Sequence, residues 1–168
     1  MNTVDKLKEK LLYKRIKGIE GDCLILEDRT EVYFECTEQN CCAGVNGEWK
    51  NVNVDAVITD VKLENQENHS DTEDYYEPYN KAELVIYHNQ NPVAQADLYA
   101  DVGNGGYYYS VLSVFVNQEN INTILSCWDY VEGYKKRRKN DTWPTNNIRY
   151  AEGWCRTVSE IIFIFQMK

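Results

Sequence analysis

The stretch that decides the fold is residues 83–116, which read ELVIYHNQNPVAQADLYADVGNGGYYYSVLSVFV. Along 93–100 apolar and polar side chains alternate, so Ala94, Ala96 and Leu98 fall on one face of an extended chain, as in a half-buried strand. Asn and Pro residues at 88–92 and glycines at 103–106 favour turns on either side of it. We therefore expect three adjacent strands in an antiparallel meander, at 83–87, 93–100 and 107–116.

Shorter runs on the N-terminal side extend this sheet. Residues 31–36 alternate in the same way and follow the apolar run 23–26 across a polar turn, which predicts a hairpin. The β-branched residues of 54–63 predict a further strand. The polar stretch 64–80 contains no Lys or Arg and has no apolar period, so it predicts a loop.

Two segments show helical rather than alternating spacing. Thr3 can cap a short N-terminal helix. A second helix is predicted near 119–130, where the apolar side chains recur every three or four residues at Ile121, Ile124, Leu125 and Trp128. The fold class that follows is α+β, mainly antiparallel β-sheet built of hairpins and a meander, with these two helices.

A single domain is expected over 1–168, because a chain of this length can bury one ordinary core. Within it we expect a basic helical arm at 1–17, a β-rich core at 18–116, and at 117–168 the second helix, a basic loop and a final strand at 154–165.

Charge is separated along the chain. Residues 1–17 carry six basic and two acidic groups, 18–134 carry four and twenty-two, and 135–168 carry eight and three. The formal net charge of -9 makes the whole protein a poor general binder of nucleic acid or anionic membranes. The N-terminus lacks the apolar core of a signal peptide, and no run approaches the roughly 18 apolar residues of a membrane span. We therefore expect a cytoplasmic protein.

Candidate metal ligands are four cysteines: Cys23, Cys36, Cys41 and Cys42. A structural zinc site needs four ligands in tetrahedral array, and these cysteines lack the two-residue gap that lets one turn offer two sulfurs. We expect small, buried, reduced cysteines and no cofactor, with a zinc-stabilised domain as the alternative. The two histidines, His69 and His88, stand near no Ser or Cys in a nucleophile context. No catalytic residue is assigned, and a non-enzymatic protein is expected.

Two charge runs could bind a partner. A basic pentad with aromatic neighbours could bind a nucleic-acid backbone or form a solvated loop; it consists of Lys135, Lys136, Arg137, Arg138 and Lys139. An acidic run mixed with tyrosines could dock on a basic protein surface or form a disordered loop. Its members are Glu64, Glu67, Asp71, Glu73, Asp74, Tyr75, Tyr76, Glu77 and Tyr79.

Three features within 18–116 carry a resemblance to a family. They are the strand pair in 19–34, the doublet Asn40-Cys41-Cys42 followed by Val45, and Gly106-Tyr107-Tyr108-Tyr109-Ser110 opening a strand. With these features the chain resembles an uncharacterised domain family found in small phage and prophage proteins. The resemblance implies a phage origin and a compact β-rich domain inside the host cell, and it implies no catalytic residue.

The lack of an assigned catalytic residue and the separation of charge along the chain together favour an interaction protein. We expect it to bind a host protein with a basic surface, such as a nucleic-acid-guided nuclease of a defence system, through the acidic run, and to inhibit that protein. The alternatives are a nucleic-acid binding module that uses the pentad, or a zinc-stabilised domain.

Overall fold

The structure is a computed structural model that describes residues 2–69, 78–103 and 108–128. The chain divides into two compact units, Met1–Asp129 and Tyr130–Lys168, and every described residue lies in the first. The basic pentad at 135–139 and the final strand predicted at 154–165 therefore lie outside the described residues. The single domain expected over 1–168 stays a prediction.

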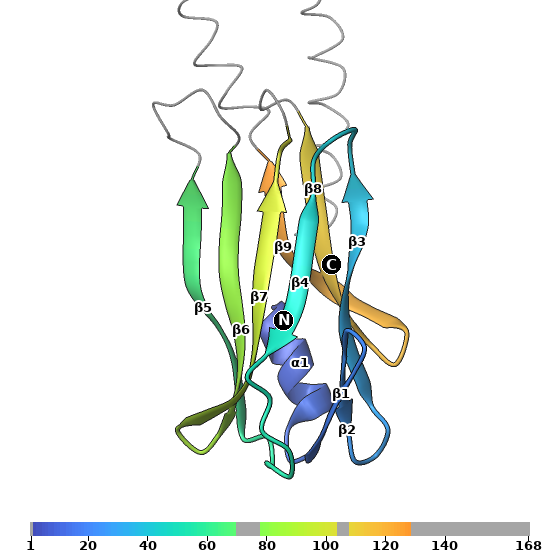
Figure 1. Ribbon diagram of the computed structural model, residues 1–168, viewed down its shortest axis with the longest axis vertical. Coiled ribbons are helices and arrows are strands. Elements are labelled where there is room, and N and C mark those ends of the chain that lie inside the picture. The colour runs from blue at the N-terminus through green and yellow to red at the C-terminus, as the bar shows by residue number, and fades with distance from the viewer. Residues whose placement is uncertain (1, 70–77, 104–107, 129–168) are drawn as a thin grey trace, which may run out of the picture. The chain divides into compact units, whose positions relative to one another are not determined.

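Two antiparallel sheets face each other across a shared core (Figure 1). The five-stranded sheet has the order β1-β2-β3-β8-β9, with bounds Ile16–Glu20, Cys23–Leu26, Glu31–Gln39, Tyr109–Val116 and Glu119–Trp128. The four-stranded sheet has the order β4-β7-β6-β5, with bounds Val45–Lys50, Asn91–Asp101, Tyr79–His88 and Asp60–His69. The predicted fold class, mainly antiparallel β-sheet with a short N-terminal helix, is confirmed.

The helix α1, Thr3–Leu11, lies between the sheets rather than outside them. Asn2 caps it in a capping box with Asp5, so the cap lies one residue before the predicted Thr3. Its residues Leu7 and Leu11 are fully buried in the core. Its lysines bind the sheets: Lys8 pairs with Asp60 at 2.7 Å, Lys10 with Glu119, and Lys6 donates to a β9 carbonyl. The basic arm predicted at 1–17 is therefore wrong for this helix, which is part of the core.

The helix predicted near 119–130 is wrong, because this segment forms β9 and pairs with β8. The pairing passes from Leu125 to Thr123 and from Asn122 to Asn120, so Ile124 and Ile121 are the extra residues of two β-bulges. Each bulge changes which face the following residues occupy, and both isoleucines are buried although they lie three residues apart. Two bulges thus reproduce the apolar spacing of a helix.

The predicted meander is correct for its first two strands and wrong for the third. β6 and β7 pair as a hairpin, whereas the next strand, β8, belongs to the other sheet. Both crossings between the sheets along 31–116, from β3 to β4 and from β7 to β8, leave from the same end of the fold, where Asn40 N–H donates to the Tyr109 carbonyl.

The loop predicted at 64–80 is partly wrong, because strands occupy both of its ends. β5 continues to His69 and β6 begins at Tyr79, with His69 and Tyr79 paired across the ladder. A bulge between Glu64 and Glu67 interrupts the alternation of side chains, and the strand lies at the sheet edge. Side chains of a polar edge strand with a bulge show little alternation between apolar and polar residues. The sequence therefore did not reveal this part of β5.

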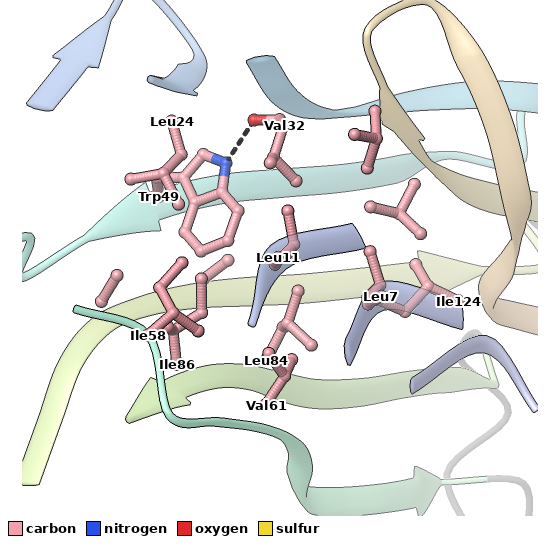
Figure 2. Close-up of a cluster of buried hydrophobic side chains, with 14 of the residues drawn as sticks. Leu7, Leu11, Leu24, Val32, Trp49, Ile58, Val61, Leu84, Ile86 and Ile124 are labelled. Carbon is pink, nitrogen blue, oxygen red and sulfur yellow. Dashed lines mark hydrogen bonds between the residues drawn. The ribbon is translucent and has the colours of Figure 1, made fainter. Parts of the chain in front are cut away.

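Aliphatic side chains from α1 and both sheets fill the core (Figure 2). The indole N–H of Trp49, on β4, donates to the Val32 carbonyl of β3 at 3.0 Å and so joins the sheets in the dry interior. Phe34 packs beside this indole with ring centroids 5.2 Å apart. No helix in the described part of the chain is long and apolar enough to cross a membrane.

Candidate functional site

The outer face of the four-stranded sheet carries the described part of the predicted acidic site. On β6, Ala82, Leu84 and Ile86 point into the core, so the residues that alternate with them point outward. Residues paired across neighbouring strands share a face. The strand-end partners Asp60, Pro92 and Asp101 are left out, since Asp60 pairs with Lys8 of α1 and Asp101 binds Gly44 and Gly103. The remaining set, called the outer face below, comprises Asn46, Glu48, Lys50, Lys62, Glu64, Glu67, His69, Tyr79, Lys81, Glu83, Val85, Tyr87, Gln95, Asp97 and Tyr99.

Three rings from three adjacent strands form a row at one end of the outer face. His69 on β5 stacks on Tyr79 of β6 with centroids 4.3 Å apart, and Tyr79 lies 5.7 Å from the ring of Tyr99 on β7. All three are half-buried. We call them the aromatic row. The ammonium of Lys81, an exposed residue, lies 4.8 Å from the centroid of Tyr79. The face of an aromatic ring attracts cations, so this is a cation–π contact.

Carboxylates outnumber lysines on the outer face by five to three. Lys50 forms ion pairs with Asp97 and with Glu83, and the hydrogen bond to Asp97 is the main cause of the raised pKa of Lys50. Glu67 approaches the Nε2 atom of His69 at 3.1 Å. Because the carboxylates are in excess, the face presents a net negative surface to an approaching protein.

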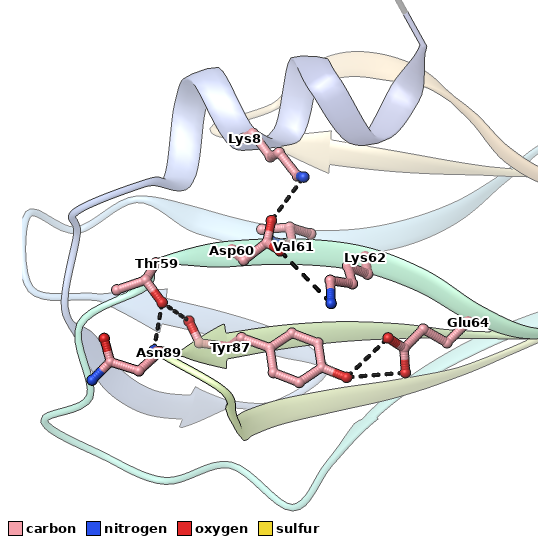
Figure 3. Close-up of polar contacts among 8 residues, drawn as sticks. All are labelled: Lys8, Thr59, Asp60, Val61, Lys62, Glu64, Tyr87 and Asn89. Atoms are coloured by element: carbon pink, nitrogen blue, oxygen red, sulfur yellow. Dashed lines mark hydrogen bonds and ion pairs between the residues drawn. The ribbon is translucent and has the colours of Figure 1, made fainter.

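At the opposite end of the outer face the polar groups are bound within the fold (Figure 3). The Tyr87 hydroxyl donates to both carboxylate oxygens of Glu64 at 2.9 and 3.0 Å, and Lys62 lies over the Tyr87 ring. Burial, and then this contact with Glu64, raises the pKa of Tyr87. Nearby, the hydrogen bond from Lys8 lowers the pKa of Asp60. Glu64 therefore has a structural partner, and the aromatic row is the end better suited to an incoming ligand.

The structure brings three of the predicted acidic-site residues together: Glu64, Glu67 and Tyr79 lie on the outer face. The others, Asp71, Glu73, Asp74, Tyr75, Tyr76 and Glu77, lie outside the described residues, as does the whole basic pentad. Segment 70–77 follows His69 directly and is joined to Tyr79 through Pro78, so the chain connects it to the aromatic row at both ends. The sequence reasoning missed His69, Lys81 and Tyr99 as members. The alternation along 93–100 did place Tyr99 and Asp97 on one face, but it did not reveal that 67–69 shares this sheet.

The expectation of buried cysteines is wrong for Cys36, Cys41 and Cys42, which are exposed; Cys23 is half-buried. All four are free thiols, and within the described residues no group of His, Cys, Asp or Glu is placed to hold a metal ion. Cys36 donates to the Gln39 side chain at 3.1 Å. The hydrogen bond with Cys41 is the main cause of the raised pKa of Tyr108. The zinc-stabilised alternative stays a prediction without a described site to support it.

Hydrogen bonds fix the turn that bears the cysteine doublet. The Asp101 carboxylate accepts from Gly44 N–H at 2.8 Å and from Gly103 N–H at 2.9 Å. The buried Ser110 hydroxyl lies within 3.0 Å of the Gly44 carbonyl and 2.6 Å of the Asp101 carbonyl. These contacts hold both crossings between the sheets, so the residues around the doublet have a structural role.

A hollow of about 370 Å³ lies where β3 and β4 meet. Phe34, Gly47 and Leu112 form its apolar part, and Asp22, Cys36 and Glu48 line the rest. Cys36 there has no neighbouring His to activate it, since both histidines lie on or beside the four-stranded sheet at β5 and β6.

Comparison with known protein families identifies the family of the chain. A family model described as "Domain of unknown function (DUF7448)" matches residues 9–115, which covers most of the two sheets up to β8. No curated protein and no solved structure matches the chain.

Proposed function

Since the chain belongs to the DUF7448 family, a family of domains of unknown function, its role must be inferred from its own surface, and we propose that it is a non-enzymatic interaction protein. It binds a protein with a basic surface through the outer face and the acidic segment 70–77. The observation that carries the proposal is the excess of carboxylates around the aromatic row, which comprises His69, Tyr79 and Tyr99, on the outer face of the four-stranded sheet.

Two physical effects support such binding. Carboxylates in excess attract a basic surface over distance and speed the encounter, while tyrosines supply contact area at little cost in conformational entropy. Segment 70–77 adds four carboxylates and two tyrosines without a Lys or Arg. It is joined to the aromatic row at both ends, so the two regions can act on one partner.

The partner class follows from the resemblance to phage domains rather than from the geometry. We propose a phage-encoded protein that acts in the host cytosol on a defence factor, such as a nucleic-acid-guided nuclease. A nuclease of this kind must hold nucleic acid in a positively charged channel, which is complementary to the outer face. Occupation of that channel would inhibit the enzyme.

The test measures binding of the immobilised full chain to a purified host nucleic-acid-guided nuclease over a range of salt concentrations. The face variant combines Glu67→Gln, Glu73→Gln and Asp97→Asn. The control combines Glu31→Gln, Glu35→Gln and Glu38→Gln, which neutralise three exposed carboxylates on β3 of the other sheet. We expect the face variant to bind about tenfold more weakly and the control to bind as the parent does. Equal weakening in both variants would show that net charge alone acts, and would refute the proposed face.

A further inference from the structure

We propose that the aromatic row is the binding site for an arginine side chain of the basic partner, whose guanidinium replaces Lys81 over the Tyr79 ring. This inference rests on the proposed function and names the residue that the outer face selects. The juxtaposition that supports it is a row of rings of which His69 and Tyr79 are stacked, a cation already on the Tyr79 ring, and a carboxylate beside the row.

Lys81 shows what the ring of Tyr79 binds. Its ammonium lies 4.8 Å from the ring centroid, yet the residue is exposed and belongs to β6, two positions from Tyr79. An exposed lysine on a flexible stem loses little when a better cation displaces it. The site is thus occupied by a removable group of the same charge as the proposed ligand.

Glu67 supplies the second half of the site. It lies across the ladder from Lys81, and its carboxylate is within 3.1 Å of the His69 ring that stacks on Tyr79. A carboxylate next to an aromatic face matches a guanidinium, which is planar, stacks on rings and donates two parallel hydrogen bonds to one carboxylate. An ammonium can form neither the stack nor the fork, so the site should prefer arginine to lysine.

A nucleic-acid base could also stack on a row of rings, but the surrounding charge opposes it. Single-strand binding surfaces combine stacking rings with a positively charged groove. Here Glu67, Glu83 and Asp97 accompany the rings, and they repel a phosphate backbone. The charge around the row therefore selects a cationic side chain.

The test compares the affinities of the full chain for two probes of equal length and charge, nona-arginine and nona-lysine peptides, by fluorescence anisotropy at low salt. We expect the arginine peptide to bind about three- to tenfold more tightly. Tyr79→Leu should abolish this preference while binding of the lysine peptide is retained, and Tyr79→Phe, which keeps the ring, should restore it. Tyr33→Leu is the control, because Tyr33 stacks on Phe115 in the other sheet. Thermal unfolding of each variant checks that it is folded.

A second pair of variants separates the site from net charge. Lys81→Gln and Lys62→Gln each remove one exposed lysine from the outer face, but only Lys81 lies over the aromatic row. We expect Lys81→Gln to tighten arginine binding several-fold more than Lys62→Gln does.

The outcomes distinguish the two proposals. If both peptides bind equally, and the face variant weakens both, the arginine site is overturned and the proposed function stands. If neither peptide binds, or the face variant leaves binding unchanged, the proposed function itself is overturned. Stronger binding of a single-stranded oligonucleotide that Tyr79→Leu weakens would replace arginine with a base as the ligand.

Discussion

The junction of β3 and β4 makes a sharp prediction about Gly47. A Cβ atom added there would lie 2.6 to 2.8 Å from Cγ, Cβ and Cδ2 of Phe34, closer than unstrained carbon atoms approach. Rotation of the phenyl ring cannot relieve the contact with its Cβ, which is fixed to the β3 backbone. Phe34 is also held against Trp49. The two sheets must therefore separate locally if Gly47 is replaced.

The expected magnitude follows from two opposing effects. Overpacking of this kind costs up to about 3 kcal/mol, and we take about 2–3 kcal/mol because the strained atoms are close to the backbone. Replacing a strand glycine by alanine regains about 0.5–1 kcal/mol of conformational entropy. Gly47→Ala should thus lower the free energy of unfolding by about 1–2.5 kcal/mol. At about 2–4 °C per kcal/mol for a chain of this size, Tm should fall by about 2–10 °C.

The assay is thermal and urea unfolding of the full chain, followed by circular dichroism. Gly44→Ala is the matched control, because a Cβ there meets its nearest atom, an oxygen of Asp101, at 3.4 Å, an ordinary contact. The control should be neutral or slightly stabilising. An unchanged or raised Tm for Gly47→Ala would show that the close approach of Phe34 to β4 is wrong.

Three further predictions concern single contacts. Trp49→Phe should lower the free energy of unfolding by about 1–3 kcal/mol, measured by urea denaturation, because the buried Val32 carbonyl loses its donor. Gly103→Ala should destabilise more than Gly21→Ala; both have positive φ, but an added Cβ at Gly103 lies 2.7 Å from the Cys42–Ala43 backbone, whereas at Gly21 it meets nothing within 4 Å. The hydrogen bond from Lys14 lowers the pKa of Asp28 to about 2. The ionised Asp28 carboxylate therefore stabilises the fold at pH values above the usual pKa of aspartate, and this stabilisation is lost as pH falls toward 2. Carboxyl NMR should find that midpoint, and Lys14→Met should move it back toward 3.8; an unmoved midpoint would exclude Lys14 as the cause.

The sequence predicted strands well where side chains alternate without interruption. The hairpins around 27–30 and 88–92 are confirmed, because their alternating or β-branched runs are joined by turn residues. Prediction failed at β9 and at the end of β5, where bulges break the period of two. It also failed at the start of β5, because the β-branched residues of 54–59 form a turn and an isolated bridge rather than a strand. The turn before β9 is a two-residue hairpin turn in which Asn117 and Gln118 both adopt positive φ. Asn117, a residue type that favours such turns, was the signal that the sequence offered.

Which strands share a sheet could not be predicted, because alternation within one strand says nothing about its neighbours. The glycines of 103–106 predicted a hairpin turn, yet β8 lies in the other sheet and pairs with β3. The candidate site could not be predicted for the same reason. Glu67, Tyr79 and Tyr99 lie up to 32 positions apart along the chain, and only the register of β5, β6 and β7 brings them onto one face.

Two of the three features that carried the family resemblance, the cysteine doublet and the opening of β8, meet at the crossings between the sheets. The doublet turn and the start of β8 are joined through Ser110, and Asp101 closes the same turn from β7. Closure of the two-sheet fold thus gives the residues around Cys41 and Cys42 a structural role. The outer face differs from this turn, because the residues of the same strands that pack in the core point to the opposite side of the sheet. Its carboxylates and rings lie outside the core, which is why we propose a binding role for them.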